Sequence, residues 1–292
     1  MTNHRVSIMG VGFIGNRYCQ LYPSECTPEP REALTPAETD VLFLRSTVSN
    51  YNVLNSATRK LDIETNLCHL MDVLPNVRGR FAFVSSWFVY HRGGLDAGHP
   101  AHEDYTSCRP VGMYAVTKLA AEQVVRSYCG TAALGLVPGP SSHQILRLCS
   151  VIGNDPRAGK HKGAIEMLLA KVVRGEDVSV YEGDNYRAVM HVDDVCRAIH
   201  MCLTKGKLDT IYNIGPTSSV RVFDLIQHAL FITGSKSRVT IVAQPPFHKL
   251  VQTTDFHMDT TKLRALGFTP SMDAYQAVER VIANMTTEDA IP

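Results

Sequence analysis

The chain of 292 residues lacks the long apolar run that would hold it in a bilayer. No segment approaches the ~18–20 apolar residues that a membrane span needs, and no signal-peptide core follows the first five residues. We therefore expect a cytoplasmic protein without a membrane partner. An excess of one charge is also absent, because 29 Lys and Arg face 28 Asp and Glu. We therefore expect no nucleic-acid partner, because binding to nucleic acid usually needs an excess of positive charge.

Paired cysteine motifs are missing as well. The eight cysteines are scattered, and none belongs to a CxxC or to a His/Cys cluster with zinc-ligand spacing. We expect buried free thiols and no metal site. Hydrophobic residues make up 45% of the chain and charged residues 20%. This composition is typical of a globular protein, and the length predicts one large domain or two intimate ones.

Short apolar runs alternate with amphipathic stretches along the first half of the chain. We predict strands at 6–9, 41–44, 81–84, 144–148 and 210–214, and helices at 16–21, 64–74 and 113–128. This alternation indicates βαβ units, hence an α/β fold with a parallel sheet covered on both faces. Such a sheet binds ligands at the carboxyl ends of its strands.

The second half is less regular and predicts a smaller lobe over the ligand edge of the sheet. Its expected elements are helices at 164–174 and 222–232, with Gly234 as a stop signal, and strands at 178–181 and 239–242.

A glycine loop stands between the first predicted strand and the helix after it. Gly10, Gly12 and Gly15 have the spacing GxGxxG. Glycines permit the tight turn and let a pyrophosphate approach the free N–H groups of a helix N-terminus. The loop therefore predicts a bound dinucleotide.

The segment after this loop leaves the choice of dinucleotide open. A NAD site usually has an acidic residue about 20 residues on, at the end of the second strand. Glu29 is present, but no clear strand precedes it, and we expect a shortened or lost βα unit between 21 and 40. Arg31 or Arg45 could meet a 2′-phosphate or could be a surface charge. NAD and NADP both remain possible.

A tyrosine and a lysine stand one helical turn apart at Tyr114 and Lys118. A nearby cation favours the phenolate, which would lower the pKa of the tyrosine and make it a usable acid or base. Ser85 and Ser86 end a predicted strand upstream, where a hydroxyl can share a hydrogen bond with the phenol and a substrate oxygen. Alone, each pattern also fits an exposed pair or a turn.

Six motifs in order resemble the extended short-chain dehydrogenase/reductases, in particular the NAD-dependent epimerase/dehydratase family that acts on nucleotide sugars. They are GxGFIG (10–15), SSWFVY (85–90), YxxxK (114–118), LRLCSVIG (146–153), HVDDV (191–195) and YNIG (212–215). The resemblance implies a Rossmann-like, doubly wound domain at 1–155 with returning segments near 186–215. It also implies a substrate lobe at 156–185 and 216–292, a bound NAD or NADP, and a nucleoside-diphosphate sugar.

The resemblance further implies roles for single residues. Tyr114 would exchange a proton with a sugar hydroxyl, Lys118 would hold the nicotinamide ribose, and Ser86 would be the catalytic hydroxyl. Cofactor contacts are implied for Gly10, Gly12, Phe13, Ile14, Gly15, Leu44, Arg45, Ser46, Thr47, Ser85, Tyr114, Lys118 and Cys149. Substrate contacts are implied for Ser86, Trp87, Ser150 and Arg187, the last through the diphosphate.

Departures from the family pattern carry information too. Met9 replaces a glycine of the loop, and Ser150 stands where an asparagine is usual. Trp87 and Phe88 follow Ser86, whereas the 4,6-dehydratases of the family have Asp-Glu there. Aromatic rings cannot transfer those protons, so dehydration and a glutamate-dependent decarboxylation are disfavoured. Trp87 is expected either as a wall of the site or as core.

These observations predict an epimerase that oxidises a sugar hydroxyl transiently, with a 4-keto-sugar reductase using NADPH as the alternative. A non-catalytic dinucleotide sensor or scaffold and, more remotely, a metal hydrolase built on His191, Asp193 and Asp194 are the hypotheses from other classes. Helices near 64–74 and 113–128 predict a homodimer, because family members commonly dimerise through this pair.

Overall fold

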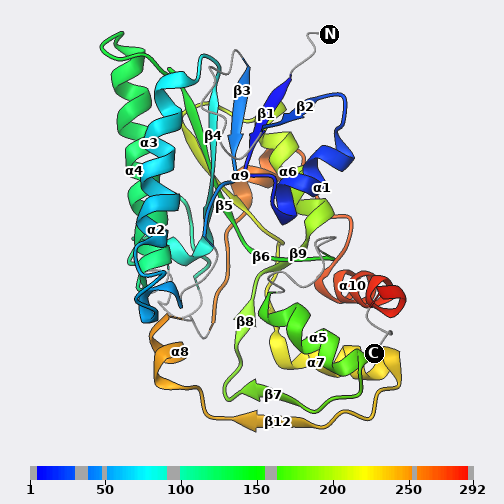
Figure 1. Cartoon of the computed structure of the whole chain (residues 1–292). Helices are drawn as coiled ribbons and strands as arrows, with labels where there is room; N and C mark the ends of the chain where they lie inside the picture. The colour runs from blue at the N-terminus through cyan, green and yellow to red at the C-terminus, as the bar shows by residue number, and fades with distance from the viewer. Residues whose placement is uncertain are drawn as a thin grey trace.

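Figure 1 shows the computed structural model, which describes residues 5–29, 39–47, 51–90, 99–154, 163–251 and 255–288. Six parallel strands form its central sheet in the order β10-β5-β4-β3-β1-β2. Their bounds are β1 Val6–Met9, β2 Cys26–Pro28, β3 Asp40–Phe43, β4 Phe81–Ser86, β5 His143–Leu148 and β10 Thr210–Ile214. The parallel α/β sheet predicted from the alternating pattern is confirmed.

The strand order reverses beside β1. From β1 the chain moves to β2 on one side and then crosses back to β3 on the other. In open parallel sheets such a switch opens a crevice outside the carboxyl ends of the two strands that flank it, here β1 and β3. Ligands bind in this crevice. The glycine loop follows β1 directly and therefore lies at this crevice.

Alternate side chains of the strands enter two separate cores. Ile8, Leu42 and Leu146 belong to one hydrophobic cluster, whereas Met9, Phe43 and Phe83 belong to the other. The period of two follows from the pleat of a strand. The first face is covered by α1 (Phe13–Leu21), α6 (Val192–Lys205) and α9 (Thr261–Ala265).

The second face is covered by two adjacent helical columns. One column is α4 (Met113–Ala133), somewhat longer than its predicted span. The other replaces the single helix expected at 64–74, and it changes geometry along its length. It runs through α2 (Leu61–Ile63), the π-helix η2 (Glu64–Cys68), α3 (His69–Val73) and the 3₁₀ turn η3 (Leu74–Asn76). A π-turn inside a helix often marks a functional position.

A short strand, β2, was missed by the sequence analysis. Its three residues pair with β1, and the Glu29 amide continues the ladder by donating to the Ile8 carbonyl at 3.0 Å. Glu29 therefore does follow a strand end, contrary to expectation, and its Oε1 accepts a hydrogen bond of 2.8 Å from Ser7. Pro28 and the strand's length hid it, because both weaken a strand signal. Arg31 lies outside the described residues.

The remaining elements pack below the sheet and around its edge (Figure 1). Helices α5 (Ala164–Val173), α7 (Val222–Thr233) and α10 (Ala274–Glu288) surround a third apolar cluster with the parallel pair β7 (Val178–Tyr181) and β12 (Val239–Val242). Gly234 ends α7 with φ 64°, as its stop signal predicts. The short elements are η1 (Asn52–Leu54), η4 (Trp87–Val89), β6 (Ser150–Ile152), β8 (Tyr186–Arg187), β9 (Val189–His191), β11 (Val220–Arg221) and α8 (Pro246–Val251). The proposed domain boundaries stay a prediction.

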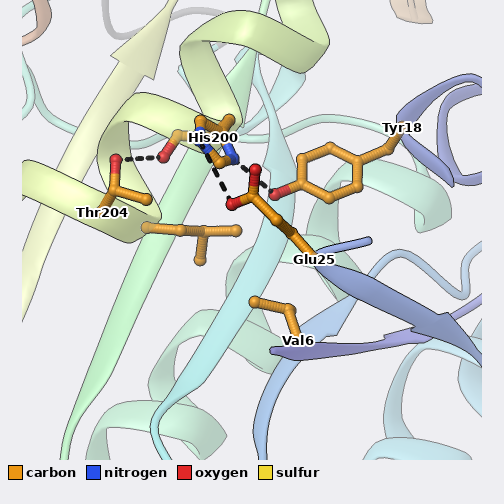
Figure 2. A pocket seen from close by; sticks show the side chains of 6 residues that line it. Val6, Tyr18, Glu25, His200 and Thr204 are labelled. Carbon is orange, nitrogen blue, oxygen red and sulfur yellow. Dashed lines mark hydrogen bonds and ion pairs between the residues drawn. The ribbon is translucent and has the colours of Figure 1, made fainter. Parts of the chain in front are cut away.

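The amino ends of β1 and β2 are closed by an aromatic and polar cluster (Figure 2). The Tyr18 hydroxyl lies 3.2 Å from His200 Nδ1, and His200 Nε2 lies 3.8 Å from Glu25 Oε2. The small hollow between these groups has no room for a water molecule. This end of the sheet is therefore filled by packed side chains. The opposite, carboxyl end carries the candidate site. Among the described residues, no helix combines the length and apolar character of a membrane span.

Candidate active site

The glycine loop brings the backbone of β1 against the strand beside it. Gly10 has φ 105°, and a Cβ there would lie 2.4 Å from the backbone nitrogen of Arg45. A Cβ on Gly15 would lie 2.6 Å from the Gly10 carbonyl oxygen. Glycine is needed at both places because any side chain would collide with backbone. The helix that starts at Phe13 has no side-chain cap, so its first N–H groups are available to an anion.

The segment after β3 lies directly against this loop. The amides of Leu44 and Arg45 donate to the Met9 carbonyl at 2.7 and 3.1 Å. Ser46 and Thr47 then turn their polar groups toward Asn66: Ser46 Oγ and the Thr47 amide each donate to Asn66 Oδ1 at 3.1 Å. The four predicted contact residues of this segment thus lie at the crevice beside the glycine loop.

Asn66 also ties this segment to α4. Its Nδ2 donates to the Thr117 hydroxyl at 2.9 Å, and Thr117 in turn donates to the Tyr114 carbonyl at 3.0 Å. Asn66 lies in the middle of the π-helix and is 1% exposed. The cluster therefore fixes the backbone of Tyr114 relative to the end of β3.

Asp62 completes this buried cluster. The residue is 1% exposed, and its Oδ1 accepts hydrogen bonds from Thr47 and, at 2.9 Å, from Asn52. Its Oδ2 is buried and has no hydrogen-bond partner within the described part of the chain. An unsatisfied carboxylate oxygen is costly in an apolar environment. Asp62 and Asn66 were not predicted as site residues from the sequence. Their i, i+4 spacing, which places both on one polar face of a helix, was the signal that could have identified them.

Tyr114 and Ser86 meet at the carboxyl end of β4. Burial raises the pKa of the Tyr114 phenol, hydrogen bonds from Ser86 and Ser46 lower it, and the neighbouring Asp62 charge raises it. The net shift is upward, which differs from the lowering that we expected from Lys118. The physical reason is that a phenolate loses more by desolvation than the two hydroxyls return.

Lys118 contacts the end of β4. Its Nζ donates to the Val84 carbonyl at 2.7 Å and lies 4.8 Å from the centre of the Phe83 ring. Burial lowers the pKa of Lys118 to about 7, although Glu122 opposes this shift. Glu122 accepts from Ser85 at 2.5 Å and pairs with buried Arg147 at 2.6 Å. The Ser85 hydroxyl is therefore held in a buried network with the Glu122–Arg147 ion pair.

The residues predicted to contact the substrate lie after β4, after β5 and on β8. Trp87 is 5% exposed and stacks on Phe88, with ring centres 4.2 Å apart, so the structure places most of it in the core. The Arg187 guanidinium lies 5.8 Å from the Trp87 ring centre, and burial lowers its pKa to about 10. Cys149 and Ser150 follow β5, and their amides donate to carbonyls of Ile214 and Ala188 at 2.8 and 2.9 Å.

The residues present fit a dinucleotide. The cradle of Gly10 and Gly15 would be filled by any Cβ, and the uncapped start of α1 offers N–H groups to a pyrophosphate. Glu29 at the end of β2 stands where ribose hydroxyls are usually bound. The hydroxyl and phenol of Ser86 and Tyr114 lie at the same edge of the sheet.

The model of the NAD dependent epimerase/dehydratase family matches residues 41–215. A curated relative, the dTDP-glucose 4,6-dehydratase of Streptomyces niveus, is 30% identical over 195 residues, which cover 66% of this chain and 53% of the relative. The chain thus spans about half the length of that relative.

Solved structures share the fold along nearly the whole chain. The UDP-glucose 4-epimerase of Thermus thermophilus in complex with NAD has a TM-score of 0.79 at 21% identity, and the match covers 97% of this chain and 99% of that one. RMD from Pseudomonas aeruginosa complexed with NADPH has a TM-score of 0.80 at 19% identity, with the same coverage. At these identities the likeness establishes the Rossmann-type architecture.

Proposed function

The chain belongs to the NAD-dependent epimerase/dehydratase family, and from that premise we propose that it is a nucleotide-sugar epimerase using NAD or NADP. The observation that carries the proposal is the meeting of Ser86 and Tyr114 at the carboxyl end of β4, next to the glycine cradle. A hydroxyl and a phenol that share one hydrogen bond can hold a single sugar oxygen between them. That is the arrangement needed to remove and return a proton at a secondary alcohol.

In the proposed reaction Tyr114 takes the proton of a sugar hydroxyl, and Ser86 donates a hydrogen bond to the same oxygen. When bound, the oxidised dinucleotide would supply the hydride acceptor and a positive charge. The alcohol thus becomes a ketone, losing a proton to Tyr114 and its carbon-bound hydrogen as hydride. After the ring presents its other face, both return and the opposite configuration results. Net oxidation is zero.

The state of Tyr114 matters for this cycle. Because burial raises its pKa, the isolated phenol is protonated at neutral pH and is the acid of the return step. The forward step needs the phenolate, which a cation beside the phenol favours. Lys118 is not among the groups that shift the pKa of Tyr114, and with its own pKa lowered to about 7 it is charged only in part at neutral pH.

Dehydration is less well supported, despite the 30% identity to a dehydratase. Trp87 and Phe88 follow Ser86, and their stacked rings offer no group that could protonate a departing hydroxyl. Asp62 lies near the phenol, but Thr47 and Asn52 already hold one of its oxygens. Epimerisation requires one acid/base group, which Tyr114 supplies.

A 4-keto-sugar reductase is the second candidate, favoured by the protonated state of Tyr114, since reduction of a ketone needs an acid. The two are separated by native mass spectrometry of the purified chain followed by incubation with a panel of nucleoside-diphosphate sugars. We expect retained dinucleotide and, by NMR, inversion at one sugar carbon without net change in the absorbance of the reduced nicotinamide. Stoichiometric oxidation of NADPH would instead identify a reductase, and a bound dinucleotide with no product from any sugar would identify a sensor.

We further propose that the enzyme is a homodimer. The outer faces of α2, α3 and α4 carry exposed apolar side chains, among them Ile63 at 42%, Met71 at 57% and Val116 at 44% exposure. The two helical columns stand side by side in Figure 1. Light scattering at micromolar concentration should give twice the mass of 32.2 kDa, and Met71→Glu should return it to that of one chain. A monomeric wild-type protein would contradict this proposal.

A further inference from the structure

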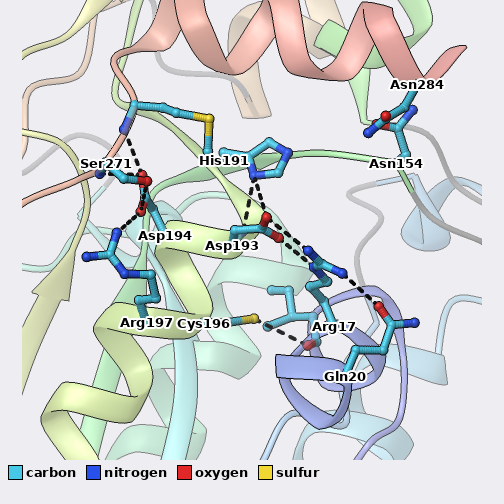
Figure 3. A network of polar contacts seen from close by, with 12 residues as sticks. Arg17, Gln20, Asn154, His191, Asp193, Asp194, Cys196, Arg197, Ser271 and Asn284 are labelled. Atoms are coloured by element: carbon cyan, nitrogen blue, oxygen red, sulfur yellow. Dashed lines mark hydrogen bonds and ion pairs between the residues drawn. The ribbon is translucent and has the colours of Figure 1, made fainter. Parts of the chain in front are cut away.

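A cavity of about 250 Å³ lies between α1, the beginning of α6 and α10 (Figure 3). Its volume is just below the ~300–1,000 Å³ of pockets for drug-sized molecules, which leaves room for a smaller ligand. Phe13 and Arg17 line it from one face of α1, four residues apart. The tip of the Phe13 ring and the side chain of Val192 both lie beside Gly153, since a Cβ there would be 2.9 Å from the ring tip and 2.7 Å from Val192. The cavity therefore lies on the side of α1 that faces α6.

The one carboxylate that faces this cavity within the described chain is already neutralised. Asp193, in the first turn of α6, pairs with Arg17 through two hydrogen bonds, Nε to Oδ1 at 2.5 Å and Nη2 to Oδ2 at 3.0 Å. A bidentate pair between a guanidinium group and a carboxylate is strong and has a defined geometry. Asp193 therefore does not make the cavity repel an anion.

His191 presents a fixed donor to the cavity. It caps α6, and its Nδ1 accepts the Asp193 amide at 3.2 Å. The neutral ring therefore carries its proton on Nε2. The residue is 4% exposed, and over the described ranges no hydrogen bond is made by Nε2. Burial lowers the pKa of His191, the charges of Asp193 and Asp194 raise it, and those of Arg280 and Arg17 lower it, with a net shift downward. The neutral ring can therefore act as a hydrogen-bond donor from the wall of the cavity.

Arg280 supplies the charge. It belongs to α10, is exposed and lines the cavity, and no ion pair joins it to another residue in the described part of the chain. Its positive charge reaches both His191 and Asp193, since it lowers the pKa of each. With Arg17 and Asp193 cancelling one another, Arg280 leaves the cavity with one net positive charge.

We propose that this cavity binds a small phosphate monoester, with the phosphate between Arg280 and His191 Nε2 and the carbon skeleton against Phe13 and Val192. The two donors come from different elements, α10 and the start of α6, and so approach from different directions. A tetrahedral phosphate accepts from several directions, whereas a carboxylate is planar and takes its donors in one plane. The volume suits a group of sugar-phosphate size. The proposal does not depend on the reaction proposed above.

The test is isothermal titration calorimetry of the full chain with ribose 5-phosphate, ribose and ribonate, repeated with NAD present. NAD competes with any phosphate bound at the glycine loop, so binding that persists belongs elsewhere. We expect one site for the phosphate, weaker binding of the carboxylate and none of ribose. Arg280→Gln should weaken phosphate binding about tenfold or more, as expected for a lost charged hydrogen bond. Arg264→Gln, an exposed arginine on α9, is the matched control and should bind as wild type.

A second variant keeps the proposal falsifiable if Arg280 only contributes long-range charge. His191→Asn keeps a side chain that can cap α6 but is too short to reach the ligand, and it should also weaken binding about tenfold, with an unchanged circular dichroism spectrum. Absence of heat up to about 10 mM ligand, loss of all binding in the presence of NAD, or wild-type affinity in both variants would each overturn the proposal.

Discussion

Tyr114 and Lys118 stand one turn apart on α4, and their side chains have different polar partners. The phenol meets the hydroxyls of Ser86 and Ser46, while the ammonium group donates to the Val84 carbonyl, 34 residues away, at 2.7 Å. The two residues therefore have separate environments, and their ionisation can be tested separately.

The first prediction concerns the phenol oxygen of Tyr114. Tyr114→Phe removes the acid/base group and keeps the ring that packs edge-on against Phe88. Turnover should fall by at least about a hundredfold, the usual contribution of general acid–base catalysis, while dinucleotide affinity by fluorescence titration changes little. Tyr128→Phe is the matched control on the same helix, since the Tyr128 hydroxyl contacts the Pro138 carbonyl on an exposed surface. An unchanged rate in Tyr114→Phe rules out the assignment.

Ser86 and Asp62 should move the pH profile of turnover in opposite directions. The hydrogen bond from Ser86 lowers the pKa of Tyr114, and the charge of Asp62 raises it. Ser86→Ala should therefore shift the acid limb of kcat/KM to higher pH and also reduce the rate. Asp62→Asn, which keeps an oxygen for Thr47 and Asn52, should shift the limb to lower pH. Shifts of the same sign in both variants contradict this account.

Lys118 makes stability depend on pH in a defined window. Its pKa is about 7 in the folded chain against an ordinary 10.5. Below pH 7 the lysine is charged in both states, and its burial cost is fully present. Between pH 7 and 10.5 the unfolded chain binds more protons, so this residue's contribution to stability should rise by up to about 1.4 kcal/mol per pH unit. Chemical denaturation across this range should show that rise for wild type relative to Lys118→Met; parallel curves would mean that the ammonium group is solvated.

Two glycines offer a matched pair in different settings. Gly10→Ala forces a side chain onto φ 105° and to 2.4 Å from the Arg45 backbone. It should destabilise the fold by about 1–3 kcal/mol and weaken dinucleotide binding. Gly130→Ala adds a Cβ with nothing within 4 Å inside α4, where alanine is favoured over glycine by about 0.5–1 kcal/mol. Thermal melts should therefore move in opposite directions, and a Gly10→Ala protein as stable as wild type would contradict the close approach.

The order of the elements and the edge of the sheet that holds the candidate residues could be predicted from the sequence. The runs at 6–9 and 81–84 identify strands because a strand buried on both faces is apolar throughout. The glycine spacing predicts a close backbone approach because no other residue permits φ 105° at Gly10 without strain. These are local signals, and they need no knowledge of distant partners.

Only the tertiary structure decided the rest. β2 exists because β1 pairs with it, although Pro28 makes its own signal weak. The cluster of Asp62, Thr47 and Asn66 joins side chains 15 and 19 residues apart, and Lys118 turns to Val84 because a buried ammonium group needs an acceptor. Which charge or donor meets which partner depends on desolvation and on contacts between remote segments. Spacing along the chain cannot express either.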